Sequence, residues 1–396
     1  PNPGKYLHAL AGSLALSCLI MTKGLFTIIP VAGGIGLCLL LARKWEIIFR
    51  WQWIAIGLLV LIGLFPSLYG YYLQFDLHPE KEIFGQHNVS GVEFFLWTSQ
   101  WGRFTNTGPI TGKGDLFFFV HTLLWAFLPW AFLAFFALFR KTKELIRGAS
   151  TTENYTYFGF ISLFIIFSLS RFQLSFYLNP LFPLLAILTT AVLLKQKTKT
   201  LRTFSIIHGV LCCLLLLALC LLHFFFSGGM PHIDTLVILL TGSGIGFYLF
   251  TRKGKYLKKI VFATALVTLS VNYYVNRDFY PALMVYQSES QVAYYVKETG
   301  IPAKDLAILG DVQSVADIIL QQVTPVYPFA SAGSEELKGK YIYTDQAGRQ
   351  KIDSTGKPYQ LLKVFDDFHV TMLTGEFINR KTREAAVNKK YLLKMQ

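Results

Sequence analysis

The chain has 396 residues, of which 53% are hydrophobic and only 15% are charged, yet its formal net charge is +14. A soluble globular domain carries about 25% charged residues and a disordered chain has low hydrophobicity, so this composition excludes both classes. Residues 277–396 contain 15 Lys and Arg and 14 Asp and Glu, so +13 of the net charge belongs to residues 1–276. The charge accompanies the apolar part of the chain, which argues against a nucleic-acid partner.

Nine segments of the N-terminal part lack Asp, Glu, Lys and Arg and approach the length of about 20 helical residues that crosses a bilayer core. Such runs predict membrane-spanning helices. We therefore expect a polytopic all-α membrane bundle of about nine transmembrane helices, followed by a small C-terminal α/β domain. The nine segments are 6–22, 24–42, 51–75, 116–139, 154–170, 172–194, 203–232, 235–251 and 260–276.

The loops between these segments alternate between strongly basic and weakly basic. One set contains 17 Lys and Arg, and the other contains only five, Lys23, Lys81, Arg103, Lys113 and Arg171. Cytoplasmic loops of membrane proteins carry an excess of Lys and Arg, so the first set is expected to face the cytoplasm and the second the outside. Nine spans then place residues 277–396 outside.

Two domains are expected, a transmembrane domain over residues 1–276 and an external α/β domain over residues 277–396. The first contains an external loop at 76–115, which is longer than a usual connection and is therefore expected to be functional, with short amphipathic helices. In the second, the patterns predict helices over 288–299 and 311–321 and strands over 306–309, 340–344, 360–364 and 391–395.

Four external side chains are candidates for binding a lipid phosphate. Lys23 lies between two apolar runs, and Gly24 opens a helix whose amide groups favour anions. Arg171 and Tyr177 lie in a tight external turn and supply two donors, while Arg103 lies in the long loop. The same residues also fit a lysine that extends to the membrane surface, or an interfacial anchor with an aromatic belt, and the patterns leave both interpretations open.

No cofactor or metal site is predicted. Glu80, Glu82 and His87 of the long loop have side chains able to bind a divalent cation or take a proton, but a solvated loop is the favoured interpretation. The five cysteines all fall inside apolar segments and have no metal-ligand spacing. The chain opens with Pro1-Asn2-Pro3 rather than Met, and we interpret it as a fragment of a longer protein.

Three segments together resemble the polyprenyl-phosphate-sugar glycosyltransferases of the GT-C superfamily, in particular the bacterial aminoarabinose transferase and protein-mannosyltransferase-like branch. Met-Thr-Lys-Gly at 21–24 resembles the Thr-Lys-Gly-Pro segment of that branch. Residues 97–104, followed by Phe-Leu-Pro-Trp at 127–130, resemble its loop ending in Arg-Phe and its next helix with Leu-Pro-Trp. Residues 168–183 resemble its Ser-Lys-x-Lys-Leu-Pro-x-Tyr-x-x-Pro-x-x-Pro turn, and the match covers about residues 6–195.

This resemblance implies a bacterial inner-membrane enzyme that transfers a sugar from a polyprenyl phosphate to a lipid, glycan or protein acceptor at the external, periplasmic face. Lys23, Arg103, Arg171 and Tyr177 would then hold the carrier phosphate, which is the leaving group. The family's catalytic carboxylate, on the first external loop, is expected upstream of residue 1. Ser99 and Gln100 replace the acidic residue and histidine that precede Arg-Phe in the aminoarabinose enzymes, so the resemblance does not extend to a metal there.

A membrane transporter or lipid flippase without glycosyl transfer is the alternative. Such a protein is expected to place ionisable residues at the bilayer midplane or to contain inverted repeats. Here the charged residues gather at the ends of the predicted spans and no internal repeat is evident, which favours the transferase.

Overall fold

The structure is a computed structural model that describes residues 3–81, 83–109, 111–148, 153–310 and 316–396. It divides into two compact units, Pro1–Phe204 and Ser205–Gln396. Glu82 and the first part of the helix predicted at 311–321 lie outside the described residues. The domain boundary expected at residue 276 and the sidedness of the loops stay predictions.

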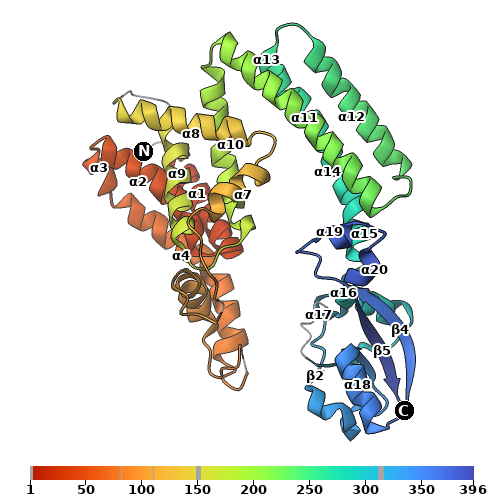
Figure 1. Ribbon diagram of the computed structural model, residues 1–396. Coiled ribbons are helices and arrows are strands. Elements are labelled where there is room, and N and C mark those ends of the chain that lie inside the picture. Colours follow the sequence, from red (N-terminus) through yellow and green to blue (C-terminus); the bar gives the residue numbers. More distant parts are fainter. Residues whose placement is uncertain (1–2, 82, 110, 149–152, 311–315) are drawn as a thin grey trace. The chain divides into compact units, whose positions relative to one another are not determined.

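The first unit is a helical bundle (Figure 1). Two of its helices have extensions: a 3₁₀ turn at Leu25–Thr27 leads into α2, and a π-helical turn at Tyr72–Asp76 continues α4. A further 3₁₀ segment at Ser175–Leu181 leads into α10. The main helices are α1 (Pro3–Lys23), α2 (Ile28–Leu41), α3 (Trp45–Ile48), α4 (Gln52–Tyr71), α7 (Phe118–Ala126), α8 (Ala131–Ile146), α9 (Asn154–Leu169) and α10 (Phe182–Leu194).

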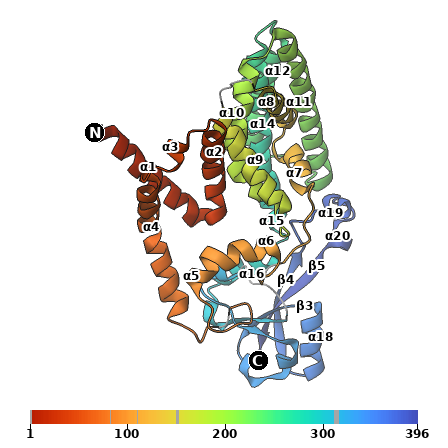
Figure 2. The same cartoon turned by 90° about the vertical axis from the view of Figure 1, so that its left-hand side faces the viewer.

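Buried apolar side chains hold this unit together. Helix α1 packs on α4 through Ile20 and Leu64, and the Ser17 hydroxyl donates a hydrogen bond to the Val60 carbonyl across the two helices at 3.1 Å. Helices α2, α9 and α10 run side by side in Figure 2. The largest core of the unit lies around Phe119, Leu123, Phe160, Leu163, Leu178, Leu181 and Leu185, all of which are at most 1% exposed.

The long loop is helical over part of its length, but where short separate helices were predicted the structure has one continuous helical segment. It consists of α5 (Gly91–Glu93), a π-helical stretch at Phe94–Gly102 and α6 (Arg103–Thr105). We refer to it as the loop helix. Ser90 caps its start, because the Ser90 hydroxyl accepts a hydrogen bond from the Glu93 amide at 3.1 Å. The helix ends at Asn106, which takes a left-handed conformation.

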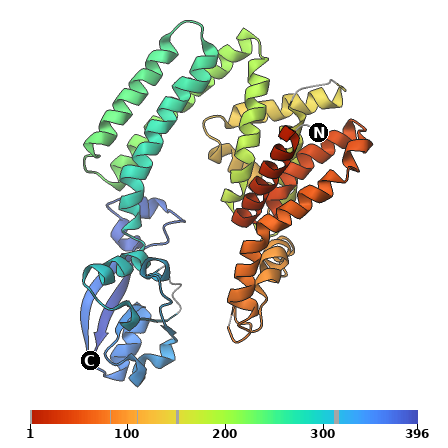
Figure 3. The ribbon, with the colours of Figure 1, turned by 180° about the vertical axis from the view of Figure 1, so that it is seen from behind.

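The second unit begins within α11 (Thr198–Phe226), which forms an elongated helical group with α12 (Ile233–Thr251) and α14 (Thr264–Tyr274), seen from behind in Figure 3. A short helix α13 (Tyr256–Lys258) and π-helical turns at Lys259–Ala263 and Val275–Phe279 flank α14, and α15 (Tyr280–Met284) follows. The Asp278 carboxylate ties two of these helices together, since it accepts hydrogen bonds from Thr235 at 2.6 Å and from the His232 amide at 2.9 Å.

The C-terminal part of this unit is an α/β fold, as predicted. Its sheet has the order β2-β1-β3-β5-β4; β1 is parallel to β2 and β3, and the other pairs are antiparallel. Helices α16 and α17 cover one face and α18 covers the other. The elements are α16 (Ser288–Glu298), β1 (Leu306–Leu309), α17 (Ala316–Leu320), β2 (Val326–Tyr327), β3 (Tyr341–Asp345), α18 (Gln346–Thr355), β4 (Tyr359–Asp367), α19 (Gly375–Ile378), α20 (Arg383–Ala386) and β5 (Asn388–Met395).

Five helices of the described residues are long and apolar enough to cross a bilayer, which makes the chain a multi-pass membrane protein. They are Tyr6–Lys23, Trp45–Asp76, Ser175–Leu194, Thr198–Phe226 and Ile233–Thr251, and two shorter apolar helices occupy Leu25–Leu41 and Asn154–Leu169. The expected number of nine spans is not confirmed. The span predicted at 116–139 is in fact two helices, α7 and α8, separated at Pro129, because proline lacks the amide hydrogen that continues a helix.

Candidate functional site

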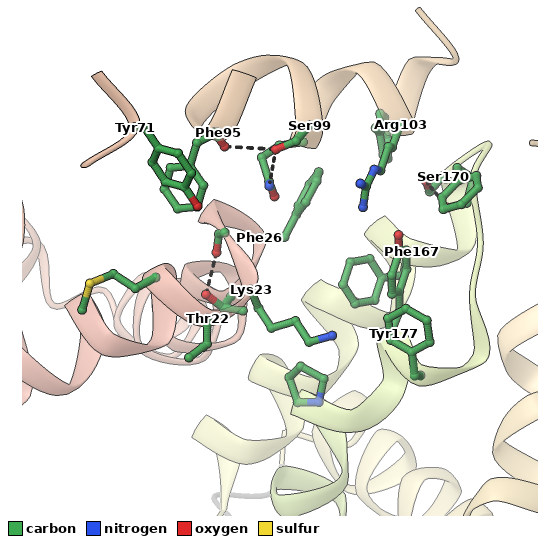
Figure 4. Close-up of a pocket in the computed structure, with 18 residues that line it drawn as sticks. Thr22, Lys23, Phe26, Tyr71, Phe95, Ser99, Arg103, Phe167, Ser170 and Tyr177 are labelled. Carbon is green, nitrogen blue, oxygen red and sulfur yellow. Dashed lines mark hydrogen bonds between the residues drawn. The ribbon is translucent and has the colours of Figure 1, made fainter. Parts of the chain in front are cut away.

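A cavity of about 300 Å³ lies in the first unit where four segments meet (Figure 4). These segments are the end of α1 with the turn after it, the end of α4, the loop helix, and the turn between α9 and α10. The cavity is lined by Met21, Thr22, Lys23, Gly24, Phe26, Thr27, Tyr71, Phe95, Ser99, Gln100, Arg103, Phe104, Phe167, Ser170, Phe172, Phe176, Tyr177 and Pro180.

Backbone hydrogen bonds fix the loop helix to the turn between α9 and α10. The Arg171 amide donates to the Phe104 carbonyl and the Phe172 amide donates to the Arg103 carbonyl, each at 3.2 Å. Two neighbouring hydrogen bonds of this kind set both the distance between the two segments and their orientation. Segments that are about 70 residues apart in the sequence therefore form one wall of the cavity.

Two cations reach this cavity from different segments. Lys23 is the last residue of α1, and its Nζ lies 4.5 Å from the centre of the Phe176 ring. The Arg103 guanidinium carbon lies 5.8 Å from the centre of the Phe172 ring. In both pairs the aromatic face offers only a weak attraction to the cation.

Neither cation is neutralised by a carboxylate. Among the described residues, Lys23 and Arg103 form no ion pair, and no Asp or Glu lines the cavity. Two uncompensated positive charges beside apolar walls attract an anion, and they do so more strongly than they would in bulk water because part of the solvent is excluded. The cavity is therefore electrostatically suited to a phosphate.

A glycine makes room for a neutral polar group in the same cavity. Gly24 has φ of 82°, and a Cβ atom there would lie 2.6 Å from the amide carbon of Gln100. The Gln100 amide instead occupies that space and donates to the Ser99 hydroxyl at 3.0 Å, which in turn donates to the Phe95 carbonyl at 3.1 Å. The remaining amide oxygen of Gln100 is available to a ligand.

The structure brings three of the four predicted phosphate-binding residues to one cavity. Lys23, Arg103 and Tyr177 all line it, although they are far apart in the sequence. The side chain of Arg171 is exposed and is not among the lining residues; only its backbone contributes, through the bond to Phe104. The assignment of all four residues to a phosphate, including Arg171, stays a prediction.

Aromatic rings supply most of the remaining wall. Phe26 lies between helices, with ring centres 6.3 Å from Phe104 and 6.1 Å from Phe167, and Tyr177 lies 5.5 Å from Phe167. Tyr71 stacks on Phe95 at 5.0 Å. Such a wall accommodates an apolar chain or the C–H face of a ring, so the cavity as a whole suits an amphiphile with an anionic head.

Sequence reasoning missed the apolar half of this site. Phe26, Phe95 and Phe167 belong to runs that read as membrane spans or amphipathic helix, and nothing in their spacing distinguishes a cavity wall from a lipid-facing surface. Gln100 was identified only as a departure from a family pattern. The described residues contain no group of three or more His, Cys, Asp or Glu side chains that would hold a metal ion.

Comparison with known proteins supports the fold. No protein-family model matches the chain. A curated protein described only as uncharacterized, from Aquifex aeolicus (strain VF5), is 30% identical over 204 residues, which cover 51% of this chain and 35% of that protein. The chain therefore spans about a third of the length of this relative.

Two crystal structures of ArnT from Cupriavidus metallidurans, one bound to undecaprenyl phosphate and one in the apo state, superpose on the chain with a TM-score of 0.62. They cover 97% of this chain and 68% of the ArnT chain at 16% identity. The chain thus has an ArnT-like fold, and the GT-C resemblance expected from the sequence is confirmed at the level of the fold.

Proposed function

We propose that the chain is part of a membrane glycosyltransferase, and that its cavity binds the phosphate of a polyprenyl-phosphate-linked sugar. Lys23 and Arg103 bind the phosphate oxygens from two sides, and the Tyr177 hydroxyl donates a third hydrogen bond. The phenylalanine walls hold the first part of the polyprenyl chain. The acceptor is a hydroxyl group of a lipid, a glycan or a protein at the external face of the bacterial inner membrane.

The observation that carries this proposal is the pair of unneutralised cations in an aromatic cavity. Among the described residues each cation interacts with an aromatic ring and with no carboxylate, so an anion would supply the missing partner for both. The ArnT-like fold adds support, since one of the ArnT structures was determined with undecaprenyl phosphate bound. Both lines point to the same ligand chemistry, a phosphate on a long apolar chain.

The same geometry suits the chemistry of transfer. When the bond between the anomeric carbon and the phosphate oxygen breaks, the bonding electrons remain on the phosphate, whose charge increases. Lys and Arg that already contact the phosphate oxygens stabilise this charge in the transition state more than in the ground state, which lowers the barrier. The acceptor proton needs a base; Glu80 and Glu93 are not assigned that role, because neither lines the cavity.

The test is the affinity of the full-length protein for polyprenyl monophosphate. Lys23→Ala and Arg103→Ala each remove a charge-assisted contact worth about 1.5–3 kcal/mol, so each should weaken binding roughly 10- to 100-fold. Lys113→Ala is the matched control, since Lys113 is an exposed cation of the same loop that does not line the cavity. Unchanged binding in both cavity variants would reject the proposal.

A further inference from the structure

A second cavity, of about 220 Å³, lies beside the loop helix and is not used by the function proposed above. Phe94 and Thr98 line it, whereas Phe95, Ser99 and Arg103 line the first cavity. Because successive residues of a helix point in directions roughly 100° apart, the two cavities lie on neighbouring faces of the same helix. The rest of the second cavity comes from Ile83, Phe84, residues 86–90, Glu93 and Pro109.

A tight turn presents an aromatic ring to this cavity. Ile83 and Gln86 exchange two backbone hydrogen bonds, of 2.8 and 3.0 Å, around the central residues Phe84 and Gly85. Both central residues have positive φ, 53° and 74°. Two-residue turns of this kind favour Asn-Gly or Gly-Gly, and a bulky aromatic residue with positive φ is strained.

Packing does not explain why a phenylalanine occupies this strained position. The Phe84 side chain is 60% exposed, so little of its ring is buried. Its one aromatic neighbour among the described residues is Phe94, whose ring lies parallel to within 23° at a centre-to-centre distance of 5.9 Å. An asparagine would form the turn with less strain and would lose little burial. The position therefore points to a ligand that uses the exposed face of the ring.

The polar groups of the cavity are available for hydrogen bonds. The side chains of Gln86, Asn88 and Glu93 have no hydrogen-bond or ion-pair partner among the described residues. His87 Nδ1 lies 3.2 Å from the Glu80 carbonyl, which accepts only, so Nδ1 carries the hydrogen of this bond, and Nε2 has no hydrogen-bond partner among the described residues. Two amides, an imidazole and a carboxylate thus line the same cavity as the Phe84 ring.

This combination identifies the chemistry of the ligand. No Lys or Arg lines the cavity among the described residues, which argues against a second phosphate site, and the polar side chains argue against a purely apolar ligand. A sugar ring has one face of C–H groups, which packs on an aromatic ring, and a rim of hydroxyl groups that both donate and accept. The volume lies below the usual range of about 300–1,000 Å³ for small-molecule sites, so it suits one ring rather than several.

We propose that this second cavity binds one sugar ring of a glycan acceptor, with Phe84 as the stacking platform. Its description as an acceptor site rests on the proposed glycosyltransferase function, whereas saccharide binding itself does not. The acceptor is then a glycan or glycolipid, and the ring held here is a neighbour of the sugar that receives the new residue. One face of the loop helix then contacts the sugar donor, and the neighbouring face contacts the glycan acceptor.

The test measures binding of methyl glycosides of glucose, galactose, mannose and N-acetylglucosamine to the full-length protein in lipid nanodiscs, by saturation-transfer NMR without any donor. At least one glycoside should bind in the millimolar range. Phe84→Asn should weaken that binding at least ten-fold while the thermal midpoint stays the same or rises, because Asn tolerates positive φ.

Phe49→Asn is the matched control. Phe49 is 80% exposed and stacks on Trp45 at 6.4 Å, much as Phe84 stacks on Phe94, but it lies outside both cavities. The Phe49→Asn variant should leave saccharide binding unchanged. Absence of binding by every glycoside, equal binding by wild type and Phe84→Asn, or a lowered thermal midpoint in Phe84→Asn would overturn the proposal. Saccharide binding without polyprenyl-phosphate binding would reject the transferase function alone.

Discussion

Removal of the Asp76 carboxylate should loosen the loop helix. Asp76 lies at the end of the helix that continues α4, and its two oxygens accept from the Ser90 hydroxyl at 2.5 Å, the Gly91 amide at 3.0 Å and the Val92 amide at 3.4 Å. It therefore satisfies amide groups at the start of the loop helix that have no partner within the helix, and it places a negative charge there. Asp76→Ala removes all three contacts.

The magnitude follows from the number and exposure of these contacts. Loss of a helix cap costs about 1 kcal/mol, within a range of about 0.5–2 kcal/mol, and the partly exposed position of Asp76 argues for the middle of that range. A loss of about 1 kcal/mol should raise the population of the open loop helix roughly five-fold. Arg103, near the far end of this helix, would then be held less firmly at the first cavity.

Hydrogen exchange of the full-length protein, read at the amides of residues 91–105, provides the assay. Asp76→Ala should lower protection there about five-fold, in line with the cost of about 1 kcal/mol. Asp115→Ala is the control, because the Asp115 carboxylate accepts from the Phe117 amide at 2.9 Å, just before a different helix, α7. Unchanged protection in Asp76→Ala, or an equal loss in Asp115→Ala, would refute the reasoning.

Two further predictions concern the second unit. Burial raises the pKa of the Tyr343 phenol, which shares a 2.6 Å hydrogen bond with Ser288, so the folded state favours the neutral phenol. The free energy of unfolding should therefore fall by up to about 1.4 kcal/mol per pH unit once the pH exceeds about 10, the pKa of tyrosine in the unfolded chain. Thermal melts should show a shallower alkaline decline in Tyr343→Phe, and an equal decline would contradict this. The Arg383 guanidinium donates to the Phe226 carbonyl at 2.7 Å and lies 4.1 Å from the Phe226 ring, so Arg383→Lys should destabilise the unit by about 2 kcal/mol in a thermal melt. Arg380→Lys should destabilise it much less, because the Arg380 guanidinium lies over the Phe224 ring but donates no hydrogen bond to the described residues.

Local patterns in the sequence were sufficient for much of the α/β fold. The strand predicted at 306–309 is β1 to the residue, because four consecutive buried apolar residues between turns fit only a central strand. In contrast, α18 was missed because only Gly348 and Ile352 of its ten residues are buried, so it lacks an apolar stripe. The two-residue strand β2 exists through its pairing with β1, which no local pattern encodes.

In the membrane part, too, local patterns predicted helices but not how the chain packs. Charge-free runs located the apolar helices, but length alone did not reveal that Pro129 divides 116–139 into two helices. Lys23, Arg103 and Tyr177 were identified individually, because each is a hydrogen-bond donor in a segment predicted to lie at the external face. Their convergence on one cavity depends on tertiary contacts, notably the backbone bond between Arg171 and Phe104, and these cannot be derived from one segment at a time.

The central claim is that Lys23 and Arg103 recognise a phosphate on a polyprenyl chain. The most direct measurement compares the affinities of the full-length protein for polyprenyl monophosphate and for the uncharged polyprenol of the same length. The account predicts that the wild type prefers the phosphate at least ten-fold and that the double variant Lys23→Ala/Arg103→Ala binds the two lipids equally, with little change for the polyprenol. Equal affinity in the wild type, or an undiminished preference in the double variant, would contradict it.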